Sequence, residues 1–323
     1  MTKYSSHSDQ SDLPDDSGRV VVVTGAGKGL GEAFAKAWAA RGANVVVSNR
    51  RRPGAPDDAG RVVEEIRGAG GQAVAEYSDM ADPGAGEAVV NAALKAFGRL
   101  DAVIANAGTS GPARKLTRGS LADFRDVMET NFFSNVALAE AAQEPLQASP
   151  SGRFLLISSS AGLYGVRGRA PYAASKGALN AFAMSLASEW RRDGVGVNIL
   201  APYAATRMTD APDLDPALAA AIAPANVGSA AVWLSSAACR HTGEIWVSGA
   251  GWLRRAQMVE GRGATAAADL SPEDVEALAA TLRGLDDVRG FAGAEAAFAD
   301  LIQECQTAQA AQAGPEAKGR DTA

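Results

Sequence analysis

The chain has 323 residues, enough for one large α/β domain or two small ones, and 47% of them are hydrophobic, so it can bury a sizeable core. It carries 31 basic and 37 acidic side chains, a net charge of −6. Such mild acidity gives no reason to expect a nucleic acid or an anionic membrane as a partner. An enzyme that acts on a small molecule fits this composition.

Cysteine and histidine are too scarce for several kinds of site. The sequence has two cysteines, Cys239 and Cys305, which cannot form a metal cluster or a disulfide framework and are typical of a reducing compartment. Neither of the two histidines, His7 and His241, stands near a nucleophile motif. The sequence therefore disfavours hydrolase chemistry of the Ser–His–Asp or Cys–His kind, and no metal site is expected.

Both ends are predicted to lie outside the folded domain. Residues 1–17 are polar and acidic and have no apolar stretch for export, which predicts a disordered leader. Residues 306–323 are rich in Ala, Gln and Gly and predict a disordered tail. No window approaches the ~18 apolar residues that a membrane-spanning helix needs, so we expect a cytoplasmic protein without a membrane partner.

Between these ends, short β-branched or apolar runs alternate with segments of helical period. This alternation is typical of βαβ units. It predicts an α/β fold with a Rossmann-like, doubly wound, seven-stranded parallel sheet and helices on both faces, as one catalytic domain over residues 18–254. The predicted strands are Val20–Val23, Val45–Val47, Ala73–Tyr77, Ala102–Ala105, Phe154–Ile157, Val195–Leu200 and Glu244–Val247.

Residues 255–305 depart from that alternation and predict a helical extension. Ser271 is a plausible N-cap with a proline at the first helical position, leading into a helix over Val275–Leu285. A second helix is expected over Ala292–Gln303. We expect the extension to pack against the core or against a partner subunit.

A glycine-rich loop follows the first predicted strand and opens a helix that is expected to run to about Arg41. Glycines permit a tight turn and a close backbone approach, and the N-terminus of a helix offers unpaired N–H groups to a pyrophosphate. The loop therefore predicts a dinucleotide cofactor. The residues expected to contact it here are Gly25, Gly27, Lys28, Gly29, Leu30 and Gly31.

Tyr172 and Lys176 stand four residues apart at the start of a long predicted helix, so they share one helix face. A nearby ammonium favours a phenolate, and we expect it to lower the pKa of Tyr172 from about 10 toward working pH. A group with such a pKa transfers protons effectively. Tyr172 is thus the candidate proton-transfer group.

Three consecutive serines, Ser158 to Ser160, follow the fifth predicted strand. Ligands of open α/β sheets bind at the carboxyl ends of the strands. Ser159, thirteen residues before Tyr172, is the candidate for hydrogen bonding to a substrate oxygen. Ser158 and Ser160 are the local alternatives.

The TGxxxGxG spacing from Thr24 to Gly31, together with this serine and the YxxxK motif, resembles the short-chain dehydrogenase/reductase family over residues 19 to about 250. The glycine spacing differs from that of extended epimerases and dehydratases. The resemblance implies an NAD(P)-dependent oxidoreductase that transfers a hydride between its cofactor and a ketone or secondary alcohol, as a homodimer or homotetramer. The family's serine–tyrosine interval and Gly162 favour Ser159 over its neighbours.

The resemblance also implies further site residues. Asn131 matches the family's fourth catalytic position, which holds a helix kink and a water that relays protons to Lys176. Asp79 matches a residue beside the adenine, and the Asn106-Ala107-Gly108 motif lines the cofactor cleft. The remaining cofactor contacts that it implies are Met80, Pro202 and Thr206.

The end of the second predicted strand favours NADP(H), with NAD(H) as the alternative. An acidic residue at this point accepts from a ribose 2′-OH, whereas an arginine neutralises a 2′-phosphate. This chain has Asn49 followed by Arg50, and Lys28 adds a second cation. The sequence therefore predicts carbonyl reduction with NADP(H).

Two stretches, 201–209 and 247–252, resemble a narrower branch that includes the dehydrogenase domain of peroxisomal multifunctional enzyme type 2 and its bacterial relatives. That enzyme is NAD-dependent and oxidises 3-hydroxyacyl-CoA. It has an acidic residue after the second strand and no lysine in its glycine loop, whereas this chain has Asn49 and Lys28 at these positions. An NAD-dependent 3-hydroxyacyl-CoA or hydroxysteroid dehydrogenase is therefore one alternative. A non-catalytic, cofactor-binding regulator is another.

The substrate is expected to lie between three segments, Thr109–Leu116, Gly162–Arg169 and Tyr203–Pro224. The last is rich in Ala and Pro and fits a lid. We interpret Arg167 and Arg169 as solvated surface side chains, with contact to an anionic substrate group as the alternative.

Overall fold

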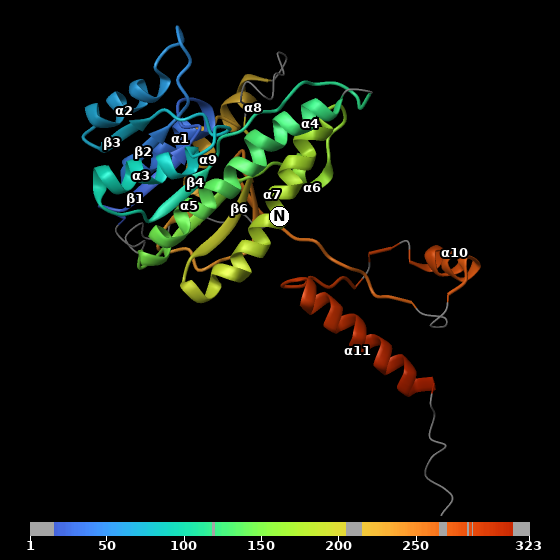
Figure 1. Ribbon diagram of the computed structural model, residues 1–323. Helices are drawn as coiled ribbons and strands as arrows, with labels where there is room; N and C mark the ends of the chain where they lie inside the picture. Colours follow the sequence, from blue (N-terminus) through green and yellow to red (C-terminus); the bar gives the residue numbers. More distant parts are fainter. Residues whose placement is uncertain are drawn as a thin grey trace, which may run out of the picture. The chain divides into compact units, whose positions relative to one another are not determined.

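The computed structural model describes residues 16–117, 120–204, 215–264, 270–282, 284–285 and 287–312. The chain divides into two compact units between Ala256 and Gln257. The first unit contains the whole sheet (Figure 1).

The sheet of the first unit has eight strands in the order β3-β2-β1-β4-β5-β6-β7-β8. Strands β1 to β7 pair in parallel, which confirms the predicted Rossmann-like sheet, and each lies within two residues of its predicted run. The strands are β1 (Val20–Thr24), β2 (Asn44–Ser48), β3 (Gln72–Glu76), β4 (Ala102–Ala105), β5 (Arg153–Ile157), β6 (Gly196–Pro202), β7 (Ile245–Gly249) and β8 (Trp252–Ala256).

Helices cover both faces of this sheet, as predicted. One face packs against α3 (Ala85–Phe97), α5 (Ser134–Ala148) and α7 (Ala170–Glu189). The other packs against α1 (Gly29–Ala39), α2 (Asp58–Gly68) and α9 (Ala225–Ser235). The shorter elements of this unit are α4 (Ser120–Met128), a π-helical turn η1 (Glu129–Phe133), α6 (Ala161–Tyr164), a 3₁₀ turn η2 (Trp190–Asp193) and α8 (Pro216–Ala221).

Strand β1 shows why the central strands read as unbroken apolar runs. Val20 and Val22 point into the core below α3 and α5, whereas Val21 and Val23 point into the core below α1 and α9. All four valines are fully buried. A strand covered on both faces leaves no position for a polar residue, and β-branched side chains pack well on a pleated surface.

The sequence analysis missed strand β8, which makes the sheet eight-stranded instead of seven-stranded. β8 pairs antiparallel with β7, with Gly249 opposite Trp252. The two residues between them, Ala250 and Gly251, both have positive φ, at 50° and 76°. This is the turn of a two-residue hairpin, but alanine is a rare residue at its first position, so the usual Asn-Gly or Asp-Gly signal is absent.

The folded unit begins earlier than the predicted leader boundary at residue 17. Asp16 is 2% exposed, and its carboxylate binds the guanidinium of Arg41 at 2.9 Å. The amide of Gly18 donates to the carbonyl of Gly42 at 3.0 Å. Asp16 and Ser17 therefore belong to the packed structure, and residues 1–15 lie outside the described residues.

One stretch, Pro216–Ser235, is long and apolar enough to cross a membrane by length and composition, with a mean hydropathy of 1.5. The sequence analysis was wrong to expect no such window. In the structure the stretch forms two helices, α8 and α9, separated at residues 222–224. Val227 and Ala231 of α9 are fully buried in the core beside α1. The apolar residues of α9 are thus those of a core helix.

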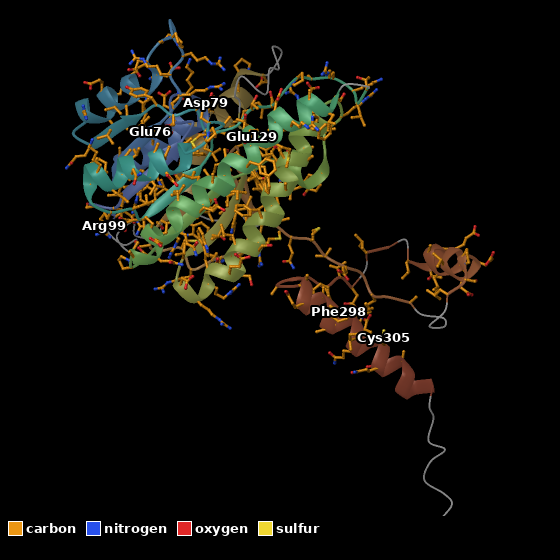
Figure 2. The ribbon with its side chains drawn as sticks, in the orientation of Figure 1. Glu76, Asp79, Arg99, Glu129, Phe298 and Cys305 are labelled. Atoms are coloured by element: carbon orange, nitrogen blue, oxygen red, sulfur yellow. The ribbon has the colours of Figure 1, made fainter. Side chains whose placement is uncertain are left out.

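The second unit contains the two predicted helices, α10 (Pro272–Thr281) and α11 (Ala294–Gln312). Ser271 caps α10 as predicted, because its hydroxyl accepts from the amide of Asp274 at 3.1 Å while that carboxylate accepts from the amide of Ser271. Phe298 and Cys305 both lie on α11 (Figure 2). This helix runs seven residues into the segment predicted as a disordered tail.

We predict that Gly86→Ala destabilises the first unit. A Cβ at this position of α3 would lie 2.7 Å from the carbonyl oxygen of Ala137 on α5. Because both groups are backbone-anchored, the helices must move apart, at a cost of roughly 1–3 kcal/mol. Thermal unfolding followed by circular dichroism measures the change.

Gly68→Ala in α2 is the matched control. A Cβ at Gly68 meets nothing within 4 Å, so this variant should unfold at or slightly above the wild-type temperature. Equal melting temperatures for the two variants would contradict the close packing of α3 on α5.

Candidate active site

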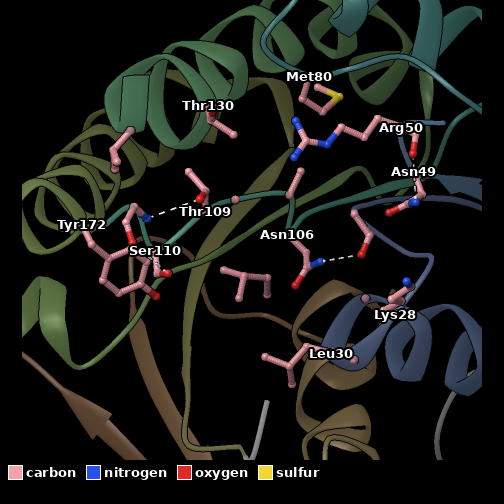
Figure 3. Close-up of a pocket in the computed structure, with 18 of the residues that line it drawn as sticks. Lys28, Leu30, Asn49, Arg50, Met80, Asn106, Thr109, Ser110, Thr130 and Tyr172 are labelled. Carbon is pink, nitrogen blue, oxygen red and sulfur yellow. Dashed lines mark hydrogen bonds between the residues drawn. The ribbon is translucent and has the colours of Figure 1, made fainter. Parts of the chain in front are cut away.

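A cleft of about 1010 Å³ lies at the carboxyl ends of the parallel strands. The strand order reverses between β1 and β4, and ligands of doubly wound sheets bind at such a switch point. Figure 3 shows Tyr172 and Ser110 on one side of the cleft, Lys28 and Arg50 on the other, and Asn106 between them.

Thr24, at the end of β1, joins the two halves of the sheet at the floor of this cleft. Its hydroxyl accepts from the amides of Asn106 and Ala107, each at 3.0 Å. The side-chain amide of Asn106 donates back to the carbonyl of Thr24 at 2.9 Å. The sequence analysis did not single out Thr24, although it begins the glycine motif. These bonds set the glycine loop against the loop after β4.

Two glycines of the loop fit the close approach that a dinucleotide requires. Gly25 has a φ of +63°, which favours glycine, and a Cβ on it would lie 3.0 Å from Ala107. A Cβ on Gly31 would lie 2.3 Å from the carbonyl oxygen of Gly25. Helix α1 can therefore begin directly under the loop and aim its free N–H groups into the cleft, where a dinucleotide pyrophosphate fits. Gly29 and Leu30 also line the cleft.

The two predicted cations of the cofactor end line the cleft and are each paired with a carboxylate. Lys28 Nζ lies 2.7 Å from Asp58 on α2, and Arg50 donates to Asp79 at 2.8 Å. Burial alone would raise the pKa of Asp79, but the hydrogen bonds from Arg50 and from the Ala81 amide hold it below its usual value. Asp79 lies just past Glu76, the last residue of β3 (Figure 2).

Asn49 occupies the end of β2 and presents no charge. Its backbone amide donates to the carbonyl of Glu76, and its side chain donates to the carbonyl of Arg50 at 3.3 Å. A Cβ on Gly27 would lie 2.6 Å from the side chain of Asn49, so the glycine loop packs directly on it. Met80, Gly108 and Pro202, which are predicted to contact the cofactor, line the cleft, whereas Thr206 lies outside the described residues.

The structure brings Ser159, Tyr172 and Lys176 together on the opposite side of the cleft. Ser159 follows β5, and Tyr172 and Lys176 lie one turn apart on α7. The ammonium of Lys176 lies 5.9 Å from the centre of the Tyr172 ring, and the Ser159 hydroxyl is close enough to the Tyr172 phenol to lower its pKa. These three side chains therefore converge on one point.

The neighbouring serines are placed differently. Ser158 is 3% exposed and donates its hydroxyl to the carbonyl of Lys176 at 3.2 Å, so it holds the helix. Ser160 does not line the cleft and lies at the start of α6. Of the three serines, Ser159 alone both lines the cleft and contacts the Tyr172 hydroxyl.

The expectation of a lowered tyrosine pKa was wrong for this structure. Burial raises the pKa of Tyr172, and the Ser159 hydrogen bond and the charge of Arg169 oppose that rise only in part. The ammonium of Lys176 faces the ring and the backbone instead of the phenol oxygen, donating to the carbonyl of Ile157 at 2.7 Å. Tyr172 is therefore a neutral phenol at neutral pH.

Burial also lowers the pKa of Lys176 to about 8, from a usual 10.5. The side chain is 4% exposed. It reaches this position because α6 and α7 pack closely: a Cβ on Gly162 would lie 2.6 Å from the backbone of Lys176. Burying an ammonium costs free energy, so the charge of Lys176 destabilises the folded state.

Asn131 lies in the π-helical turn η1 and is fully buried. This turn separates α4 from α5 at the residue where the family resemblance implies a helix kink. The side-chain amide donates to the carbonyl of Thr109 and to the hydroxyl of Ser175, both at 2.9 Å, and accepts from the Thr109 amide at 2.7 Å. Ser175 in turn donates to the carbonyl of Tyr172 at 2.8 Å. Asn131 therefore ties the loop after β4 to the first turn of α7.

Ser175 is a positioning residue that the sequence analysis missed, although it stands within the YxxxK motif. Among the cleft-lining residues that had no predicted role are Arg52, Asp58, Asp126 and Thr130. Asp58 and Asp126 stand outside every motif that the sequence analysis used, so only the fold brings them to the site.

Comparison with known proteins agrees with this geometry. Residues 19–215 match the short chain dehydrogenase family. The chain belongs to the short-chain dehydrogenase/reductase family. Members are oxidoreductases that act on CH–OH groups of small molecules, bind NAD(H) or NADP(H) and are typically oligomeric.

Three relatives illustrate the range of this family. Peroxisomal multifunctional enzyme type 2 of Drosophila melanogaster is 37% identical over 76% of this chain, which spans 41% of that protein. A short chain dehydrogenase from Mycobacterium avium is 33% identical, with a TM-score of 0.74, over 84% of this chain and 96% of that one. A 7α-hydroxysteroid dehydrogenase, solved with NADH and 7-oxo glycochenodeoxycholic acid, is 29% identical, with a TM-score of 0.65, over 73% of this chain and 94% of that one.

We predict a pH-dependent stability difference between the wild type and Lys176→Met without cofactor. Below pH 8 the folded enzyme bears the full cost of burying the ammonium, and the cost falls as the pH rises from the folded pKa of about 8 toward the unfolded value of 10.5. Wild type should therefore gain roughly 2 kcal/mol relative to Lys176→Met between pH 7 and pH 9.5. Urea unfolding at both pH values measures it.

The same substitution at Lys95, an exposed residue of α3, controls for the loss of one lysine. A stability gap between wild type and Lys176→Met that stays constant from pH 7 to pH 9.5 would show that the ammonium is not desolvated.

Proposed function

We propose that this enzyme uses NADP(H) to reduce a ketone to a secondary alcohol, with Tyr172 as the proton donor. The observation that carries this proposal is the arrangement at the two ends of one cleft. Ser159, Tyr172 and Lys176 converge at one end, and the two cations Lys28 and Arg50 stand at the other. A dinucleotide with a 2′-phosphate fits between them.

The state of Tyr172 supports the reductive direction. Its raised pKa keeps the phenol protonated near neutral pH, so it can donate to an oxygen on which negative charge develops. Ser159 provides a second hydrogen bond to the same oxygen. Nicotinamide, when bound, supplies the hydride. The protein supplies position and the proton.

Lys176 and Asn131 support Tyr172 from within the protein. The ammonium of Lys176 lies against the Tyr172 ring, and a pKa of about 8 allows Lys176 to exchange protons at working pH. Asn131, through Ser175, holds the first turn of α7 and with it the position of Tyr172. The four residues thus act as one unit.

Three features support NADP(H) over NAD(H). The end of β2 carries the uncharged Asn49 where an acidic residue would accept from a ribose hydroxyl. Arg50 is a planar guanidinium suited to a phosphate, and Lys28 adds a second charge. Both cations are half exposed and line the cleft, so a phosphate can reach them.

A second candidate is an NAD-dependent 3-hydroxyacyl-CoA or hydroxysteroid dehydrogenase that works oxidatively. It is favoured by the carboxylates of Asp58 and Asp79, which already neutralise the two cations, and by the names of the relatives. A spectrophotometric screen separates the two candidates. Ketones are offered with NADPH and with NADH, and the corresponding alcohols with NADP⁺ and NAD⁺.

We predict that Tyr172→Phe lowers kcat by at least about a thousandfold, because it removes the proton donor. Cofactor affinity should stay within several-fold, since the ring remains in place. Stopped-flow turnover and fluorescence titration with NADPH measure the two quantities. Tyr164→Phe on α6 is the matched control, because Tyr164 is 78% exposed and does not line the cleft. Substantial activity in Tyr172→Phe would remove Tyr172 from this role.

We predict that Arg50→Ala raises the Kd for NADPH by about tenfold or more, the loss expected for one charge-assisted pair with a phosphate. The Kd for NADH should change by no more than a few-fold. Arg51→Ala is the control, because Arg51 stacks over Tyr77 outside the cleft lining. Equal effects of Arg50→Ala on both cofactors would overturn the NADP(H) assignment.

A further inference from the structure

Arg169 stands at the substrate side of the cleft, directly before α7. It is the N-cap residue of α7, precedes Tyr172 by three residues, and lines the cleft together with Ser159 and Tyr172. Its side chain is partly buried. Arg167, two residues earlier, is exposed and is not part of the cleft lining. The sequence interpretation of both arginines as surface side chains thus fits Arg167 but is wrong for Arg169.

The guanidinium of Arg169 has no acidic partner among the residues that the structure describes. Arg50 is paired with Asp79 and Arg114 with Asp123, whereas Arg52, which also lines the cleft, follows β2 at the cofactor end. Asp126 also lines the cleft, but no ion pair joins it to Arg169. The positive charge of Arg169 is felt at the Tyr172 hydroxyl, whose pKa it helps to lower. Arg169 therefore offers free donors beside the reacting position.

A single guanidinium at this position is suited to bind a carboxylate. Its planar donors bind the two oxygens of a carboxylate side by side, and one positive charge balances one negative charge. A phosphate dianion would call for a second cation. Arg169, at the N-cap of α7, lines the same cleft as Tyr172, three residues later, so one substrate molecule can bind Arg169 with one group and Tyr172 with another.

We propose that the substrate is an oxo acid, or the matching hydroxy acid, whose carboxylate binds Arg169 while its carbonyl oxygen faces Ser159 and Tyr172. This inference rests on the proposed function and adds the substrate class. It separates two kinds of substrate: a thioester or a steroid ketone has no charge near the reacting carbon, whereas an oxo acid does. Arg169 then selects for the acid and orients it.

Paired substrates that differ only in charge test this inference. 3-Oxobutanoate and 2-oxo-4-phenylbutanoate are each compared with their methyl esters, with NADPH as reductant. Wild type should show a kcat/KM about tenfold or more higher for the acid than for the ester. Arg169→Gln should lose that preference through a higher KM for the acid, with the ester little changed. Arg169→Lys should restore part of it, and Arg167→Gln should behave as wild type.

A binding measurement does not depend on turnover. Calorimetric titration of 4-phenylbutanoate and of its amide into the enzyme saturated with NADP⁺ should show tighter binding of the acid in wild type and in Arg167→Gln. That preference should be absent in Arg169→Gln.

The possible outcomes distinguish this inference from the function beneath it. Equal kcat/KM for acid and ester in wild type, or equal binding of the acid and the amide, would overturn the role of Arg169 and leave ketone reduction standing. An acid preference in binding without reduction of any ketone would support Arg169 and count against the proposed function. Loss of both preferences in Arg167→Gln would contradict the assignment of the charge to Arg169.

Discussion

The buried ammonium of Lys176 is the constraint on which the candidate site depends. A charge that lies out of water needs a fixed partner, and here the partner is the carbonyl of Ile157 at the last residue of β5. That contact requires α7 to pass close over the end of the strand. Gly162 makes the passage possible, because any side chain there would strike the backbone of α7. Once α7 is in place, Tyr172 lies beside Ser159 on one side of the cleft.

A second set of contacts connects Tyr172 to the glycine loop at the cofactor end of the cleft. Thr24 accepts from two amides of the loop after β4, and the next residues of that loop bind Asn131. Asn131 continues through Ser175 to the first turn of α7. A chain of hydrogen bonds therefore runs from the glycine loop to Tyr172. A rigid cleft of this kind holds hydride donor and proton donor at a fixed separation, which is how position contributes to catalysis.

Charge is distributed unequally along the cleft. At the cofactor end, Lys28 and Arg50 each stand beside a carboxylate, so a phosphate bound by either cation must share it or displace the acid. At the substrate end, Arg169 has no such competitor among the described residues, and its field reaches Tyr172. The cofactor end is thus suited to distinguish NADP(H) from NAD(H), and the substrate end is suited to bind a negatively charged group of the substrate.

The sequence by itself determined the features that depend on local pattern. Buried valine runs mark the parallel strands, the glycine spacing marks the loop under the dinucleotide, and a four-residue interval places Tyr172 and Lys176 on one helix face. Tertiary structure alone decided what depends on distant neighbours. It raised rather than lowered the pKa of Tyr172, paired Lys28 with Asp58, and brought Arg169 into the cleft. Burial and charge partners arise from residues far apart in the chain, and no local pattern encodes them.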